Sequence, residues 1–194
     1  PTRRSSDLVW DDCSNIDDYG EYKVFGTVTD IMSTEADNTS RVIIKVTVLP
    51  DSLLENSDFE TGDESGWTIE GNGPWVDSED VYRGDYGLHF WSSGKVEFTA
   101  TQSITALSAG SYAASMMIQG GDAGDNQEIT ITLTNETKKT SVSATTTITG
   151  WLEWKNPVTD SIEADEGDEL TVTIYVKGAA GAWGTIDDAY LYKE

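Results

Sequence analysis

The chain has 194 residues and a formal net charge of −23, from 12 Lys and Arg against 35 Asp and Glu. This excess of acid disfavours nucleic acid and anionic membrane surfaces as partners, because both are negatively charged. With 37 % hydrophobic residues and 18 glycines, the composition is typical of a folded globular chain rather than of a disordered acidic tail. The single cysteine, Cys13, excludes an internal disulfide. Neither a membrane-spanning stretch nor a signal-peptide pattern occurs, so we expect a soluble piece of a longer protein.

The first part of the chain is short of strands. Residues 1–8 resemble a translated sequencing adapter and are left out of the fold prediction. Strands are expected at 9–10, 21–29 and 41–49, which is too few for a sandwich of about seven strands. We therefore predict a boundary near residues 50–52 and a truncated β-unit over residues 9–52.

The second part, residues 53–194, has the size of a single domain. Its apolar residues recur with a period of two, which indicates half-buried strands, and Gly, Asn and Asp-rich turns separate these runs. The clearest runs are Tyr112, Ala114, Met116, Ile118; Ile129, Ile131, Leu133; and Leu170, Val172, Ile174, Val176. No segment predicts a helix of ten residues. The pattern predicts an all-β sandwich or jelly roll.

Catalytic chemistry has little support in the sequence. The only histidine, His89, and the only cysteine, Cys13, lie in different units, so neither forms a nucleophile and base pair with the other. Pairs of carboxylates arise in any fold with 35 acidic residues and do not by themselves indicate glycoside hydrolysis. We predict a protein that is not an enzyme.

The seven tryptophans exceed what the cores of two small sandwiches require. Sugar rings account for such a surplus, because a pyranose presents a face of C–H groups to an aromatic ring and its hydroxyls to polar groups. Alternation places His89 and Trp91 on the face of one strand that points away from the core, and Met117 and Gln119 on that face of another. If the two strands share a sheet, these side chains line one surface.

The other tryptophans are sorted by their context. Trp75, with its neighbour Asn72, and Trp183 lie in glycine-rich segments interpreted as loops, where we expect sugar contacts. At least one of Trp151 and Trp154 is expected in the core. Trp67 is also expected there.

Calcium is the expected cofactor, because loop carboxylates and carbonyls suit it and no His/Cys cluster offers a zinc site. Asp58 and Glu60 alternate onto one face near the start of the second unit, and Asp187 opens the last strand, which can run beside the first. Backbone oxygens of Arg83 to Asp85 would complete the ligands. A solvated acidic turn is the alternative interpretation.

The first unit is similar to bacterial immunoglobulin-like linker domains. The motifs that carry this similarity are Trp10-Asp11-Asp12, Asp17-Asp18-Tyr19-Gly20-Glu21-Tyr22, Gly26-Thr27-Val28 and Val46-Thr47-Val48. In that family such a sequence forms the later strands, so the resemblance implies that the earlier ones lie upstream.

The second unit resembles the family 61 carbohydrate-binding modules over nearly all of residues 53–194. The most specific motifs are Q-G-G at 119–121 and W-G-T-I-D-D at 183–188. Three more follow in the family's order: Asn56-x-Asp58-Phe59-Glu60, Phe90-Trp91-Ser92 and Gly150-Trp151-x-x-Trp154-Lys155-Asn156-Pro157.

This resemblance implies a galactose-binding-like jelly roll with a structural calcium, attached to a family 53 endo-β-1,4-galactanase and binding β-1,4-galactan. It carries over Glu60, Asp187 and Asp58 as metal ligands, and Trp91, Gln119 and Trp183 as sugar contacts. A monomer tethered to its enzyme and secreted by a bacterium fits the resemblance.

Several alternatives stay open. The module could bind another plant cell-wall polysaccharide. It could also be a small jelly-roll hydrolase or lyase, or an adhesion spacer that meets a protein through its sheet edges.

Overall fold

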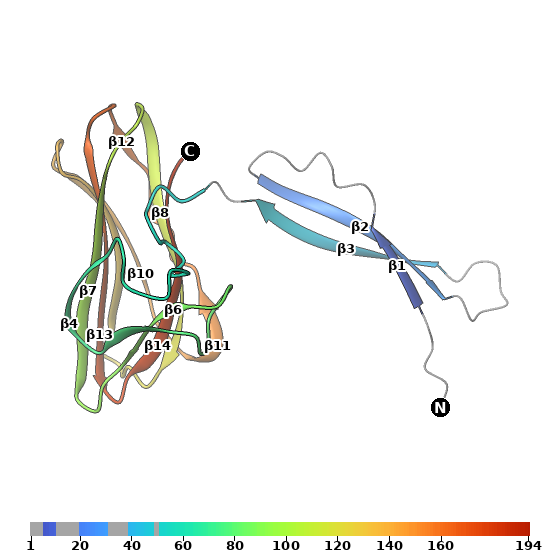
Figure 1. Cartoon of the computed structure of the whole chain (residues 1–194), viewed down its shortest axis with the longest axis horizontal. Coiled ribbons are helices and arrows are strands. Elements are labelled where there is room, and N and C mark those ends of the chain that lie inside the picture. Colours follow the sequence, from blue (N-terminus) through green and yellow to red (C-terminus); the bar gives the residue numbers. More distant parts are fainter. Residues whose placement is uncertain (1–5, 11–19, 31–38, 49–50) are drawn as a thin grey trace. The chain divides into compact units, whose positions relative to one another are not determined.

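The computed structural model describes residues 6–10, 20–30, 39–48 and 51–194, which form strands and connecting loops (Figure 1). The chain divides into two units, Pro1–Pro50 and Asp51–Glu194. Cys13 and the first five residues of the adapter-like segment lie outside the described residues, and residues 6–8 begin a strand. Among the described residues there is no helix that is long and apolar enough to cross a membrane.

The first unit is an antiparallel sheet. Its strands follow one another in the order β1 (Ser6–Trp10), β2 (Gly20–Asp30) and β3 (Thr39–Val48), close to the predicted ranges. Trp10 and Val42 lie on either side of Gly26 in the register, and both side chains are exposed. A single sheet of three strands leaves apolar side chains in solvent. The immunoglobulin-like assignment of this unit stays a prediction.

The second unit is a sandwich of two antiparallel sheets, which confirms the predicted fold class (Figure 1). The five-stranded sheet has the order β10 (Thr140–Thr146), β9 (Glu128–Asn135), β13 (Glu169–Ala180), β7 (Lys95–Thr105) and β4 (Thr68–Asn72). The six-stranded sheet has the order β11 (Gly150–Lys155), β8 (Gly110–Gly121), β14 (Trp183–Lys193), β6 (Gly87–Trp91) and β5 (Pro74–Asp77), and β12 (Ile162–Ala164) pairs with β8.

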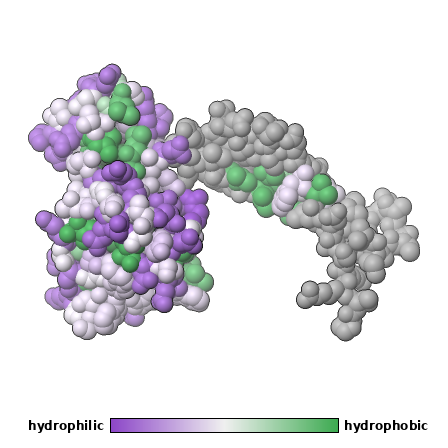
Figure 2. All heavy atoms as spheres, in the orientation of Figure 1, coloured by the Kyte–Doolittle hydropathy of each residue, from purple (hydrophilic) through white to green (hydrophobic). Residues whose placement is uncertain are grey.

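Alternating apolar residues fill the space between the sheets. The side chains of all three predicted runs are buried, as the period of two requires. Phe90 of the six-stranded sheet packs against Phe98 of the five-stranded sheet, with ring centroids 5.6 Å apart. Burial of each such side chain stabilises the fold by roughly 1.5–3 kcal/mol. On the face of the second unit that Figure 2 shows, hydrophilic residues are interspersed with small hydrophobic patches.

The start of the second unit runs beside its last strand, as predicted. The Leu53 N–H donates to the Leu191 carbonyl at 2.7 Å, and the Ala189 N–H donates to the Ser57 carbonyl at 2.8 Å. Trp67 is buried in this region and stacks on Phe59, with ring centroids 5.6 Å apart. The prediction that Trp67 belongs to the core is therefore confirmed.

Two glycines allow the central strands of the six-stranded sheet to approach closely. Gly184 of β14 lies opposite Gly120 of β8. A Cβ atom on Gly184 would lie 2.3 Å from the Gln119 carbonyl oxygen and 2.5 Å from Cζ of Phe90. Neither the backbone nor the buried ring can yield that space, so this position requires glycine.

Replacing Gly184 by Ala is expected to lower the free energy of unfolding by about 1–3 kcal/mol, because the new methyl group overpacks the core. Urea denaturation followed by tryptophan fluorescence measures the change. Gly94→Ala is the matched control, since its Cβ would meet only Ser92 Oγ, at 3.7 Å. Equal stability of the two variants would contradict the packing argument.

Candidate functional site

The outward face of the six-stranded sheet brings together most of the predicted sugar contacts. Gln119, Thr185, His89 and Trp75 lie in register across β8, β14, β6 and β5. Two residues further along, Trp183 of β14 lies opposite Trp91 of β6. Because side chains two residues apart point to the same side of a strand, these residues share one face.

Trp75 and Trp183 lie in strands and not in loops, contrary to the prediction. A single residue, Gly73, separates β4 from β5, and the chain passes there from one sheet to the other. Gly73 has a φ of +107°, a conformation that L side chains rarely adopt. Trp183 begins β14 after a tight turn at Gly181. Gly73 and Gly181 therefore lie at corners of the sandwich, close to Trp75 and Trp183.

Three tryptophan side chains present aromatic surface on this face. Trp91 is 53 % exposed, Trp75 is 41 % exposed and Trp183 is half-buried. The Trp183 ring lies over Gly121, where an added Cβ would come within 3.0–3.2 Å of three indole atoms. Gly121 is therefore the floor on which this ring lies.

Carboxylates hold two of these indoles. Trp183 Nε1 donates to Asp122 Oδ2 at 2.9 Å, and Trp75 Nε1 donates to Asp77 Oδ2 at 3.0 Å. The bond from Trp75, together with the Ser78 N–H, lowers the pKa of the Asp77 carboxyl, which stays ionised at neutral pH. The indole rings are fixed at one edge, and the face of each ring that points away from the sheet is left for a ligand.

His89 is 8 % exposed and lies under Trp75, with ring centroids 6.0 Å apart. Its Nδ1 atom lies 3.4 Å from Thr185 Oγ1. Its Nε2 atom has no hydrogen-bond partner of normal geometry among the described residues. The Glu79 backbone also interacts with the ring. Burial lowers the pKa of His89, against the opposing pull of nearby carboxylates, so the imidazole is neutral at pH 7.

Gln119 is fully buried, which corrects its prediction as a direct sugar contact. Its Nε2 atom donates to the Asp80 carbonyl at 3.0 Å, and its Oε1 atom accepts the Leu152 N–H. The amide is used inside the protein because residues 78–86 cover the middle of the sheet. Gln119 positions two backbone segments in this structure.

Asn72 is also engaged elsewhere. It ends β4 in the five-stranded sheet, where Nδ2 donates to the Lys95 carbonyl at 2.8 Å and Oδ1 accepts the Glu97 N–H at 3.0 Å. The prediction grouped it with Trp75 because the two are close in sequence. The sheet change at Gly73 separates them.

The expectation of a core residue at Trp151 or Trp154 is wrong. Trp151 is 61 % exposed, and Trp154 is half-buried against Tyr82, with ring centroids 5.1 Å apart and an edge-to-face geometry. Both residues lie on β11, which is the edge strand of the six-stranded sheet. The register of β11 shifts between its pairs Gly150–Gly120 and Lys155–Ile118, so the period of two does not continue through the two tryptophans.

The candidate metal ligands meet at residues 82–86. Glu60 accepts the N–H groups of Asp85 and Tyr86 at 2.9 Å. Asp187 accepts the N–H groups of Tyr82 at 2.9 Å and Arg83 at 3.1 Å. The two carboxylates therefore hold one short segment between them.

Gly84 lies at the centre of this segment with a φ of +70°. A Cβ atom there would come within 2.2–2.7 Å of the Glu60 carboxylate, so the segment passes close to this side chain. This close approach explains why a glycine occupies the position.

Asp187 is fully buried, and this burial raises the pKa of its carboxyl to about 6 despite three backbone N–H donors. The adjacent Asp188 has a cationic partner, because the Arg83 guanidinium binds its Oδ2 atom through Nε at 2.8 Å and through Nη2. No such cation faces Asp187 in the ion pairs of the described residues. A buried carboxylate of this kind favours a cation nearby.

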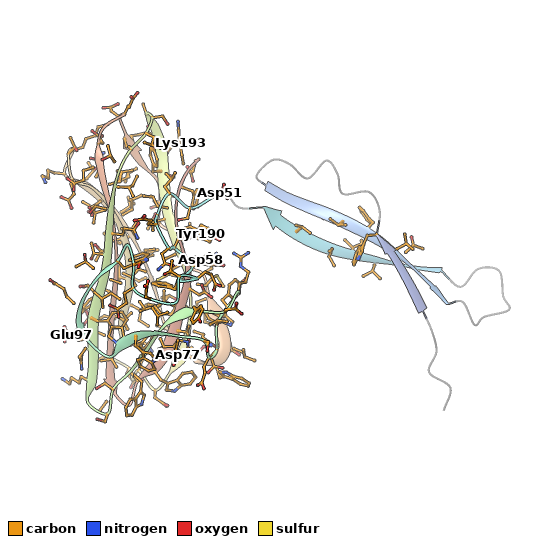
Figure 3. All side chains as sticks on the ribbon, viewed as in Figure 1. Asp51, Asp58, Asp77, Glu97, Tyr190 and Lys193 are labelled. Carbon is orange, nitrogen blue, oxygen red and sulfur yellow. The ribbon has the colours of Figure 1, made fainter. Side chains whose placement is uncertain are left out.

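The remaining predicted ligands are not drawn into a cluster. Asp58 Oδ1 accepts the Glu60 N–H at 3.4 Å, and Asp58 lies close to Tyr190 (Figure 3). Asp85 contributes its N–H to Glu60, and Arg83 pairs with Asp188. Within the described ranges no three His, Cys, Asp or Glu side chains converge, so a bound ion would need backbone carbonyls as well.

Comparisons with known proteins define the class. No family model matches the sequence, and no curated protein matches it. Among solved structures, TmCBM61, determined in complex with β-1,4-galactotriose, is 30 % identical with a TM-score of 0.68, and the match covers 75 % of this chain and 100 % of that one.

Two more distant structures share the fold. The family 16 Carbohydrate Binding Module-2 is 14 % identical (TM-score 0.53; 73 % of this chain and 99 % of that one). The CBM22-1 xylan-binding domain from Paenibacillus barcinonensis Xyn10C is 17 % identical (TM-score 0.51; 70 % and 90 %).

The sandwich with aromatic rings on one open face is thus a non-catalytic carbohydrate-binding module of the β-sandwich type. Within that class, the chain belongs to family 61 of the carbohydrate-binding modules.

The lowered pKa of His89 predicts a pH-dependent stability. Below pH 6.5 the unfolded chain binds a proton at His89 that the native chain binds less readily, so this group destabilises the fold as the pH falls. The raised pKa of Asp187 acts in the opposite direction between about pH 4 and 6, because there the native state holds the extra proton. A mutant comparison is therefore needed to isolate His89.

We compare the unfolding free energy of the parent protein with that of His89→Gln. The parent value minus the variant value is expected to be smaller at pH 5 than at pH 7.5, because only the parent contains the histidine whose pKa folding lowers. Urea denaturation of both proteins at each pH measures the difference in unfolding free energy. A difference that is the same at both pH values, or larger at pH 5, would show that folding does not lower the pKa of His89.

Proposed function

We propose that this module binds β-1,4-galactan, the side chain of pectic polysaccharides, and brings an attached endo-β-1,4-galactanase to its substrate outside a bacterial cell. The observation that carries this proposal is the pair of cross-strand indoles, Trp91 and Trp183, on an open sheet face. The family 61 relative was determined with β-1,4-galactotriose, which supports the same ligand class.

The proposed mechanism is binding without chemistry. The C–H face of a galactose ring packs on the Trp91 or Trp183 indole. Polar groups beside these indole rings form hydrogen bonds with the hydroxyls of the sugar. Because carboxylates already fix Trp183 and Trp75, little side-chain freedom is lost when a sugar binds.

Charge also favours a neutral ligand. Residues 53–194 contain 7 Lys and Arg against 25 Asp and Glu, a net charge of −18. A neutral galactan chain is not repelled by this field, whereas an anionic polymer is.

Tethering supplies the biological effect. A monomeric module joined to an enzyme raises the effective concentration of that enzyme at the polymer, even when each contact is weak. Within this proposal the first unit is an immunoglobulin-like linker between the module and its enzyme.

The proposal includes a structural calcium ion. Glu60 and Asp187 both face the segment 82–86, and the buried Asp187 carboxylate has no cationic partner of its own among the described ion pairs. These two carboxylates and the carbonyl oxygens of residues 83–85 are the hard oxygen donors that calcium prefers. The ion would neutralise the buried charge and hold the segment in place.

Affinity electrophoresis in native gels tests the ligand. We expect β-1,4-galactan to retard the protein, and arabinogalactan and xylan to have little effect. Trp91→Ala and Trp183→Ala should each lower the apparent affinity measured from this retardation at least tenfold, because each removes an indole ring on which a sugar packs. Leu107→Ala is the matched control, since Leu107 is 80 % exposed and follows β7 at the opposite end of the sandwich from Trp183.

The other arms of that experiment separate the alternatives. Retardation by xylan alone would assign a different cell-wall polysaccharide. Unchanged mobility in every gel would overturn the sugar ligand and favour the adhesion spacer. Full retardation of both tryptophan variants would move the sugar site away from this face.

Calcium is expected to raise the melting temperature relative to chelator by roughly 5 °C or more at saturation, because the ion binds only the native state. Glu60→Gln should abolish most of this increase, since it removes a proposed ligand charge. Differential scanning calorimetry of both proteins, with calcium and with EGTA, measures the effect. An identical melting temperature in both solutions would rule out the calcium site.

A further inference from the structure

Trp151 lies on β11, at the edge of the sheet that carries Trp91 and Trp183. Gly150 pairs with Gly120, and the register of β11 becomes irregular after that pair. Trp151 and Leu152 are 61 % and 58 % exposed. Two adjacent large apolar side chains in solvent are costly, and a ligand that covers them would recover that cost.

The backbone at this point is strained. Leu152 has a φ of +61°, in the left-handed region that a branched side chain rarely enters. Such a conformation costs on the order of 1–3 kcal/mol and persists only where the surroundings impose it. Here the Leu152 N–H donates to Oε1 of the fully buried Gln119, which fixes the irregular turn.

The indole of Trp151 is fixed as well. Its Nε1 atom donates to Asp80 Oδ1 at 2.9 Å, and the Asp80 carbonyl accepts Nε2 of Gln119 at 3.0 Å. Tyr82, which lies in the same segment as Asp80 (residues 78–86), contacts Trp154 of β11. This is a second contact between that segment and β11. Trp151 is therefore exposed and oriented at once.

The same arrangement holds Trp183 on the proposed sugar face. Asp122, which accepts the Trp183 indole N–H, has a φ of +58°, and Asp80, which accepts the Trp151 indole N–H, has a φ of +50°. Both are aspartates in the left-handed region, where this residue type is tolerated, and each aims its carboxylate at an indole edge. The two tryptophans are prepared in the same way.

We infer that Trp151 is a further sugar-binding plate, which holds monosaccharides of a galactan chain beyond those at Trp91 and Trp183. This inference rests on the proposed function. Neighbouring strands lie about 4.8 Å apart, so β11 is roughly 10 Å across the sheet from β14, with β8 between them. Only a chain of several sugars can contact both places. Trp151 therefore determines chain-length preference, and Asp80 and Gln119 are positioning residues for it.

Isothermal titration calorimetry with β-1,4-galacto-oligosaccharides of increasing length tests the inference. Trp151→Ala is expected to weaken binding of long oligosaccharides and of galactan about tenfold and to leave the shortest ligand that binds unchanged. Trp91→Ala should weaken all lengths alike. Leu107→Ala, which removes an exposed apolar side chain at the far end of the sandwich, should bind as the parent does.

A second set of variants tests the positioning role. Asp80→Ala should reproduce the length-dependent loss, because the indole is freed, and Asp80→Asn should retain affinity, because its amide oxygen still accepts the indole N–H. Near-ultraviolet circular dichroism should show a loss of tryptophan signal in Asp80→Ala without ligand. Trp151→Phe should keep part of the long-chain affinity, since it retains a ring.

The outcomes separate this inference from the proposed function. If the parent protein binds no galactan of any length, the proposed function fails. If the parent binds long chains and Trp151→Ala binds them equally well, only the role of Trp151 fails. An equal loss for short and long ligands in Trp151→Ala would also overturn the inference, because it would place Trp151 at the primary site.

Discussion

The pairing of β14 with β6 on one side and β8 on the other is the constraint on which the site depends. It brings Trp183 opposite both Trp91 and Gly121. The strands reach this register because Gly184 and Gly120 present no side chains where their backbones approach. This register of β14 therefore determines both the packing of Phe90 on the core face of the sheet and the position of the tryptophan rings on its outward face. A shift of one residue would turn the tryptophans inward and expose the core side chains.

Charge in this protein is arranged around its aromatic groups. Carboxylates of Asp77, Asp122 and Asp80 accept the indole N–H groups of Trp75, Trp183 and Trp151. Each bond satisfies the one polar atom of the indole at the ring edge and leaves the apolar face free. Part of the acidic excess thus has a defined structural role.

The segment 78–86 connects two regions that the sequence treats separately. Its second half is held by Glu60 and Asp187, the candidate calcium ligands. Its first half meets Gln119 and Trp151 on the outward face of the six-stranded sheet, where we propose that sugar binds. The same short segment therefore has contacts to both regions. Its covering position also explains why His89 and Gln119 are buried although they point away from the core.

The sequence by itself determined the architecture of the second unit. Period-two runs such as Ile129 to Leu133 identify strands and their inner faces, because burial of one sheet face leaves that pattern in the chain. The same alternation placed Trp91 and His89 on the outer face. The motifs at 119–121 and 183–188 also indicated family 61, and the structural comparison shows that membership.

The tertiary structure alone decided which of these residues remain available to a ligand. Gln119 is occupied by Asp80, 39 residues earlier, and Trp151 is fixed by the same Asp80, 71 residues away. Alternation reports only whether a side chain points toward or away from the core. It does not report that an irregular segment folds over the outer face, nor that β11 is an edge strand. Those facts come from contacts between distant parts of the chain, which no local pattern encodes.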